Sequence, residues 1–108
     1  MANNQDLMRG ITETVILKLL SERTMYGYEI IKMVNERTNG EFQWKEGTLY
    51  PCLHRLEEEG LIASSWELST NKPRKYYSLT QKGESVVTGR VEESRRFCAT
   101  LGVLLAHV

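Results

Sequence analysis

Cysteine and histidine are scarce in this sequence, and each shortage excludes a class of protein. The two cysteines, Cys52 and Cys98, stand far apart with no Cys-x-x-Cys spacing, which argues against a disulfide scaffold and a structural zinc site. The two histidines, His54 and His107, have no carboxylate at ligand spacing. We therefore expect no metal, no cofactor and no catalytic centre, and a chain that is not an enzyme.

Net charge and long apolar runs are also missing. The 14 basic residues balance 14 acidic ones, so nucleic-acid binding must be argued from where the charges lie. No apolar run of about eighteen residues and no signal-peptide core occur, so we expect a cytoplasmic protein without a membrane partner. At 108 residues, 41% of them apolar, the chain has enough material for one hydrophobic core.

Apolar residues recur at helical spacing in the first half of the chain. Between Leu7 and Leu20 they return every four residues, which predicts a helix with a wide buried face. A second helix is predicted to open at Thr24 or Met25 and to end near Gly40, a residue typical of helix C-caps.

A third helix is predicted over residues 46–60. Leu49, Leu53 and Leu56 form one apolar stripe, and Gly60 can end the helix in the left-handed conformation. Pro51 is expected in the first turn, where its missing N–H breaks no helical hydrogen bond. Hydrogen-bonding side chains are expected to share the exposed front of this helix: Thr48, Tyr50, His54 and Arg55.

Beyond Gly60 the apolar residues alternate, which predicts a β-hairpin. Residues 62–68 and 74–79 are the expected strands, the second with Tyr77 and Leu79 facing inward. The turn between them is basic, and Trp44 and Trp66 are read as core or dimer-contact residues. Three helices followed by a hairpin predict a mainly α fold with a small β-hairpin, a winged helix-turn-helix DNA-binding domain over residues 1–80.

The remaining residues, 81–108, are predicted to form a long C-terminal dimerisation helix capped by Thr80. At 1.5 Å per residue it would span about 40 Å, more than the small head can cover. A 4-3-4-3-4 spacing, typical of paired helices, is interrupted by Ser94 and predicts a homodimer. The expected dimerisation residues are Val87, Val91, Cys98, Leu101 and Leu105.

The front of the third helix and the basic hairpin favour double-stranded DNA as the partner. Arg55 is the best donor to guanine, although Glu57 or Glu58 could hold it instead. A tyrosine hydroxyl at the start of the second helix suits phosphate. A dimer would read two half-sites, so the operator should be palindromic. The expected DNA-binding residues are Tyr26, Thr48, Tyr50, Pro51, His54, Arg55, Lys72, Arg74 and Lys75.

Three motifs in order resemble the PadR family of transcriptional regulators. They are Tyr-Gly-Tyr-Glu-Ile at residues 26–30, Gly-Thr-Leu-Tyr-Pro followed by Leu, Arg-Leu-Glu and Gly-Leu-Ile within residues 47–62, and Arg-Lys-Tyr-Tyr followed by Leu-Thr and Gly within residues 74–83. The resemblance covers about residues 9–84. It implies a dimeric winged-helix repressor, released from its operator by a small molecule such as a phenolic acid or a hydrophobic drug. The single short final helix looks like the smaller subfamily.

The effector of such a repressor is expected to be small and apolar or aromatic. Drug-binding relatives carry a tryptophan on the final helix, and this sequence departs from them with Ser94 at the nearest position. The expected effector-binding residues are Val91, Ser94 and Phe97. Two alternatives stay open: a dimeric protein-interaction module, and a redox-responsive regulator using Cys52 or Cys98, since a thiol near a helix N-terminus has a lowered pKa.

Overall fold

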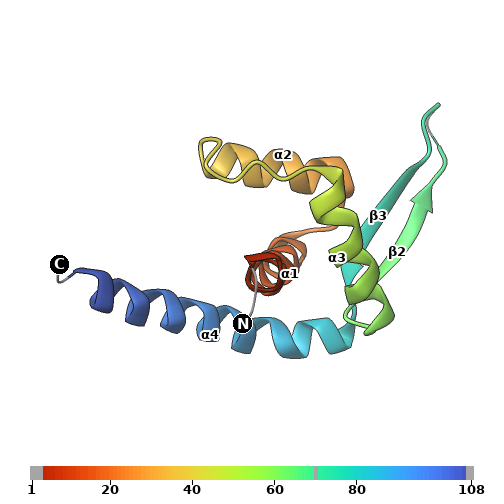
Figure 1. The fold of residues 1–108 in the computed structure, drawn as a ribbon. Helices are drawn as coiled ribbons and strands as arrows, with labels where there is room; N and C mark the ends of the chain where they lie inside the picture. The colour runs from red at the N-terminus through yellow and green to blue at the C-terminus, as the bar shows by residue number, and fades with distance from the viewer. Residues whose placement is uncertain (1–3, 70, 107–108) are drawn as a thin grey trace.

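The computed structural model describes residues 4–69 and 71–106, with side chains from residue 9 onward. It confirms a mainly helical winged helix-turn-helix with a long final helix (Figure 1). The elements in chain order are α1 (Asn4–Glu22), β1 (Met25–Tyr26), α2 (Gly27–Arg37), α3 (Glu46–Glu58), β2 (Ile62–Glu67), β3 (Arg74–Leu79) and α4 (Gln81–Ala106).

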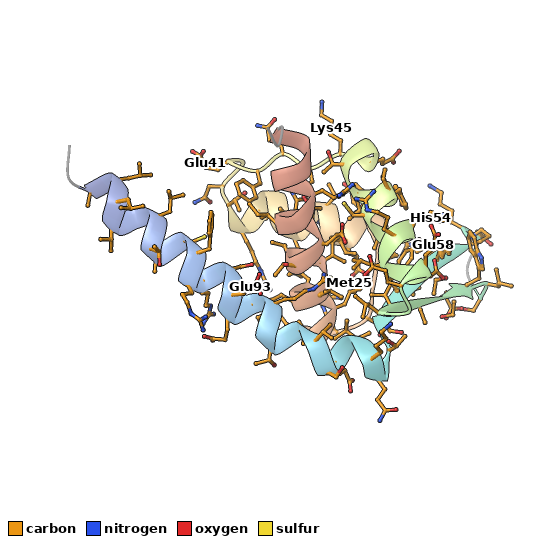
Figure 2. All side chains as sticks on the ribbon, turned by 60° about the horizontal axis from the view of Figure 1, so that its bottom comes forward. Met25, Glu41, Lys45, His54, Glu58 and Glu93 are labelled. Carbon is orange, nitrogen blue, oxygen red and sulfur yellow. The ribbon has the colours of Figure 1, made fainter. Side chains whose placement is uncertain are left out.

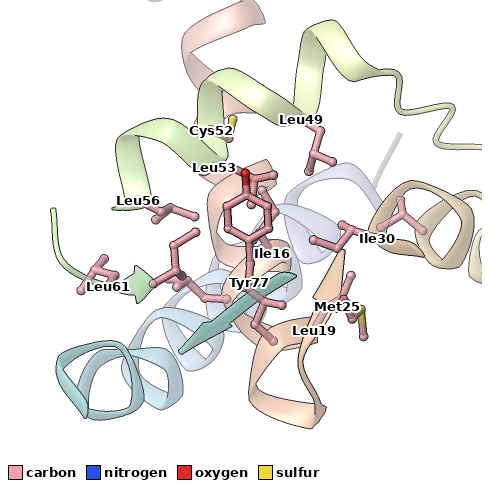
Figure 3. Close-up of a cluster of buried hydrophobic side chains, with 14 of the residues drawn as sticks. Ile16, Leu19, Met25, Ile30, Leu49, Cys52, Leu53, Leu56, Leu61 and Tyr77 are labelled. Atoms are coloured by element: carbon pink, nitrogen blue, oxygen red, sulfur yellow. The ribbon is translucent and has the colours of Figure 1, made fainter. Parts of the chain in front are cut away.

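The core lies between α1, α3 and the sheet (Figure 3). The leucine stripe of α3 is buried as predicted, and Tyr77 of β3 is 4% exposed beneath it. Trp44 is 5% exposed and belongs to this core, whereas Trp66 is 61% exposed. The prediction of a core position is therefore confirmed for Trp44. It is wrong for Trp66, which is not part of the core of its own subunit.

The sheet has a third strand that the sequence pattern did not reveal. β1 pairs antiparallel with β3, opposite Tyr77 and Tyr76, and the strand order is β1-β3-β2. The helix expected to open at Thr24 or Met25 therefore begins later, at Gly27. Tyr26 is extended, and its backbone N–H donates to the Glu29 carboxylate over 3.1 Å, which satisfies a donor at the start of α2.

The C-terminal end of α3 agrees with the prediction, but the position of its proline does not. Gly60 takes a φ of +78° just past the helix, as expected for a left-handed terminator. Pro51, however, is the sixth residue of a helix that begins at Glu46, so it lies in the second turn and the first-turn prediction is wrong. Its missing N–H removes the helical donor to the Gly47 carbonyl, and both residues are exposed to water.

α4 begins against the head and then leaves it (Figure 1). The Gly83 N–H donates to Thr80 Oγ1 over 3.0 Å, confirming Thr80 as the cap. The first half of α4 packs on α1, and the chain measures 56 × 30 × 27 Å. Large apolar side chains are exposed on the distal half: Phe97, Leu101, Val103, Leu104 and Leu105. Over residues 4–69 and 71–106, no helix is long and apolar enough to cross a membrane.

Candidate nucleic-acid interface

The outer face of α3 is a narrow exposed strip. A helix turns about 100° per residue, so the side opposite the buried leucines carries Gly47, Pro51, His54 and Glu58. His54 and Glu58 point outward together, with His54 Nε2 2.8 Å from Glu58 Oε1 (Figure 2). The expectation that His54 has no carboxylate at a suitable spacing is therefore wrong. We call these four residues the α3 strip. Its N-terminal half is neutral and sterically open, which suits close approach to a groove of DNA.

Tyr50 and Thr48 flank the strip on its two edges, and both are exposed as predicted. Tyr50 is 44% exposed, and its ring and hydroxyl lie against Gly27 so closely that a Cβ there would collide with them. Glycine at this position therefore allows the start of α2 to meet α3 directly. The contact fixes the two helices relative to each other at the end that faces the hairpin.

Arg55 does not share the exposed front with the other three residues. Its Nε lies 3.3 Å from Glu13 Oε2, and its Nη2 donates to Cys52 Sγ over 3.2 Å. The acid that holds Arg55 therefore comes from α1. Glu57, the first alternative holder, instead accepts a hydrogen bond from Ser64 over 2.6 Å. The side chain of Arg55 is 34% exposed, so it lies at the α1 edge of α3 rather than on the strip.

The hairpin carries its cations on aromatic rings. The Arg74 guanidinium lies 4.6 Å from the centroid of the Tyr26 ring, and Tyr26 meets Tyr76 edge-on at 5.3 Å. Lys75 Nζ lies 5.7 Å from the Tyr77 centroid, and Lys75 is half-buried opposite Trp66, one residue pair from the turn. Lys72, in the turn, is exposed.

A groove of about 290 Å³ separates the hairpin from the starts of α2 and α3. Sequence reasoning missed the exposed Trp66 here, because strand alternation alone assigned it to the core face. Tyr28, a second tyrosine at the start of α2, is exposed as well. The groove joins predicted DNA-binding residues from three separate segments of the chain. Its lining is Tyr26, Gly27, Tyr28, Tyr50, Trp66, Pro73, Arg74, Lys75 and Tyr77.

A second groove, of about 740 Å³, runs between the N-terminal part of α1 and the middle of α4. Two predicted effector residues, Ser94 and Phe97, line it, and so do Cys98 and Leu101 of the predicted dimer seam. Val91 is half-buried against the subunit's core, and Val87 is 9% exposed inside that core. Those two seam residues therefore pack within their own subunit, while Leu105 is exposed.

Cys52 is a buried thiol with a raised pKa. Its side chain faces α1 and is 3% exposed, and this burial raises the pKa despite the nearby Arg55 guanidinium. The expectation of a lowered pKa is wrong, because desolvation outweighs the favourable charges. Within residues 4–69 and 71–106 no group of three His, Cys, Asp or Glu side chains is placed to hold a metal.

This burial predicts that Cys52 is chemically inert in the folded protein. In a Cys98→Ser variant, we expect a coloured thiol reagent to react with Cys52 only on unfolding, because the thiolate is both scarce and covered. The matched Cys52→Ser variant retains Cys98, which is exposed in the single subunit. Rapid reaction of the native Cys98→Ser protein would restore the redox interpretation of Cys52.

Known proteins resemble this chain in both fold and sequence. Residues 16–89 match the Transcriptional regulator PadR-like family. A transcriptional regulator from Clostridium thermocellum is 35% identical, with a TM-score of 0.76, over 95% of this chain and 98% of that one. Transcriptional regulator YqjI of Escherichia coli is 35% identical over 68% of this chain but only 34% of its own length. Bacillus subtilis PadR, solved in complex with operator DNA, is 28% identical with a TM-score of 0.65, over 73% of this chain and 45% of that one.

Proposed function

Because this chain belongs to the PadR-like family of transcriptional regulators, and is thus a DNA-binding regulator rather than an enzyme, we propose that it is a cytoplasmic repressor. It binds palindromic operator DNA as a homodimer and leaves that DNA when a small apolar or aromatic effector binds. Residues 1–80 act as the DNA-binding unit and residues 81–108 as the dimerisation helix.

One observation carries the DNA-binding half of this proposal. The exposed N-terminal half of α3, the start of α2 and the cation-bearing hairpin border the same groove. The open positions of the α3 strip, with Thr48 and Tyr50 beside them, suit contact with base edges. Tyr26, Lys72, Arg74 and Lys75 suit the sugar-phosphate backbone, which positions the protein without reading sequence.

The dimer rests on the distal half of α4. Four of the five large apolar side chains exposed there lie within about 100° of one another around the helix: Phe97, Leu101, Leu104 and Leu105. Such a patch on a single subunit usually marks an interface. Two heads joined along this helix would place their α3 strips on half-sites about one helical turn of DNA apart.

The groove between α1 and α4 is our proposed effector site. It combines the apolar Ile11 and Phe97 with the small polar Ser94, and it shares Cys98 and Leu101 with the proposed dimer seam. An effector there releases DNA only if it binds the non-binding arrangement of the two heads more tightly, since equal affinity would shift nothing.

The salt dependence of DNA binding tests this function through the hairpin. Each lysine on a phosphate contributes about 0.9 to the slope of log affinity against log salt. Lys72→Ala should therefore lower the slope by about one unit per subunit and weaken all duplexes alike. The measurement uses a duplex selected by the wild-type protein from a random library, with a scrambled duplex of equal composition alongside.

Arg96→Ala is the matched control, because it removes one exposed positive charge from α4, which runs away from the hairpin (Figure 1). Its salt slope should equal that of the wild type. An unchanged slope in Lys72→Ala would place the hairpin away from DNA. If the wild type binds no duplex with steep salt dependence, the protein-interaction module becomes the better account.

A further inference from the structure

We propose that Glu13 is a positioning residue that holds Arg55 away from DNA in the free protein, and that Arg55 turns to a DNA phosphate when this ion pair opens. The inference rests on the proposed function. It concerns a single contact between α1 and α3, joining residues 42 positions apart in the chain.

The charge of α3 gives the first reason. Between Glu46 and Glu58 the helix carries three glutamates and one arginine, Arg55. The α3 strip ends in Glu58, so with Arg55 turned toward α1 the outward face of the helix offers no arginine or lysine to DNA. In a DNA-binding helix with three acidic residues and one arginine, that arginine is the only side chain of the helix that can offset the repulsion from phosphates.

The geometry of the pair gives the second reason. The Arg55–Glu13 contact is 3.3 Å long and uses Nε, and the other described hydrogen bond goes to a sulfur atom. Short bidentate arginine–carboxylate pairs have N···O distances of about 2.7–2.9 Å and are considerably stronger. The Arg55 side chain is also 34% exposed. Opening this single contact therefore costs less than opening a bidentate pair, and the freed side chain starts next to the exposed face of α3.

The surroundings of Glu13 give the third reason. Its side chain is only 11% exposed, so its carboxylate needs a cation whenever Arg55 leaves. Arg9 lies one turn earlier on the same face of α1 and lines the same groove as Glu13. Arg9 is also close enough to lower the pKa of Cys52, the thiol that Arg55 touches. Arg9 can pair with the Glu13 carboxylate when Arg55 leaves, so that the buried charge keeps a counter-charge.

The position of Glu13 links this exchange to the rest of the molecule. Glu13 lines the groove between α1 and α4 while its carboxylate touches Arg55. A molecule bound in that groove would thus contact Glu13, whose carboxylate holds the Arg55 side chain in its present orientation. The contact gives the proposed effector site a direct connection to the DNA-facing helix.

The test is a comparison of two glutamate variants on the selected duplex. Glu13→Gln keeps the size of the side chain and removes its charge, so Arg55 is released. DNA binding should then tighten by up to about fivefold per subunit, the range of one weak ion pair. Glu93→Gln removes the same charge from another residue of the same groove, on α4 (Figure 2). This control measures the general effect of a lost negative charge on DNA binding, and its gain in affinity should be smaller than that of Glu13→Gln.

The inference requires that the difference in DNA affinity between the two glutamate variants depends on Arg55. In an Arg55→Gln background, Glu13→Gln should behave like Glu93→Gln, and Arg55→Gln alone should lower the salt slope by about one unit per subunit. Equal effects of the two glutamate variants in the wild-type background would overturn the inference. So would weaker DNA binding and a lowered unfolding midpoint in Glu13→Gln, which would make the pair a brace for α3. Failure of the wild type itself to bind DNA would instead overturn the proposed function.

Discussion

Leu101→Asp should give folded monomers that bind operator DNA at least about a hundredfold more weakly, because the second head no longer adds to the affinity of the first. Leu101 is 42% exposed in the subunit and lies in the groove between α1 and α4. In the proposed dimer it is covered by the partner, where a carboxylate would be buried without a counter-charge. Sedimentation measures the assembly, and a DNA titration measures the affinity.

Val103→Asp is the matched control on the same helix. Val103 is 64% exposed and lies about 200° around the helix from Leu101, so it faces away from the groove. This variant should remain dimeric and bind DNA as the wild type does. An intact dimer in Leu101→Asp, or a monomer in Val103→Asp, would place the interface on another face of α4.

Gly83→Ala should destabilise the fold by about 3 kcal/mol, the upper part of the range for overpacked sites. A Cβ at Gly83 would collide with the backbone carbonyl oxygen of Leu61, and it would also crowd the Leu79 side chain. The Leu61 oxygen cannot swing aside, because it also accepts the Thr80 N–H at the junction of the hairpin and α4. Denaturant unfolding measures the loss, and thermal unfolding should show a midpoint lower by roughly 10–20 °C.

Gly89→Ala provides the comparison, because apart from its own stretch of helix nothing lies within 4 Å of the position its Cβ would take. Alanine favours the helix by up to about 1 kcal/mol over glycine, so this variant should be slightly more stable than the wild type. Equal stability of the two alanine variants would show that the start of α4 can shift to make room. The pair thus separates packing at Gly83 from helix propensity.

Much of the fold was predictable because the spacing of apolar residues is periodic within each helix and strand. The leucines of α3 return at helical spacing, the hairpin alternates, and Gly60 and Thr80 mark the ends of elements by their own chemistry. Each of these signals is local and involves several residues or a residue with an unusual backbone preference. The helix predicted over residues 81–108 is observed over Gln81–Ala106, and residues 107–108 lie outside the described part of the chain.

The remaining features depend on partners that lie far away in the sequence. β1 has two residues, too few for any periodicity, and exists because β3 offers it an edge. Arg55 has acidic neighbours at 57 and 58, yet its partner is Glu13, 42 positions earlier. Trp66 has the same strand parity as the buried Ile62, but β2 has left the core by that point.

The α3 strip lies outside the packing that holds the subunit together. A side chain added at Gly47 would meet open space, and Pro51 and His54 are exposed. Substitutions at these three positions should therefore leave the hydrophobic core intact, and under the proposed function we expect them to change which operator is preferred. Tyr50 and Arg55, on the edges of the strip, do not have that freedom, because one packs on Gly27 and the other pairs with Glu13. Under the proposed function, we expect such a scaffold to acquire new target sites by a few changes along one face of one helix.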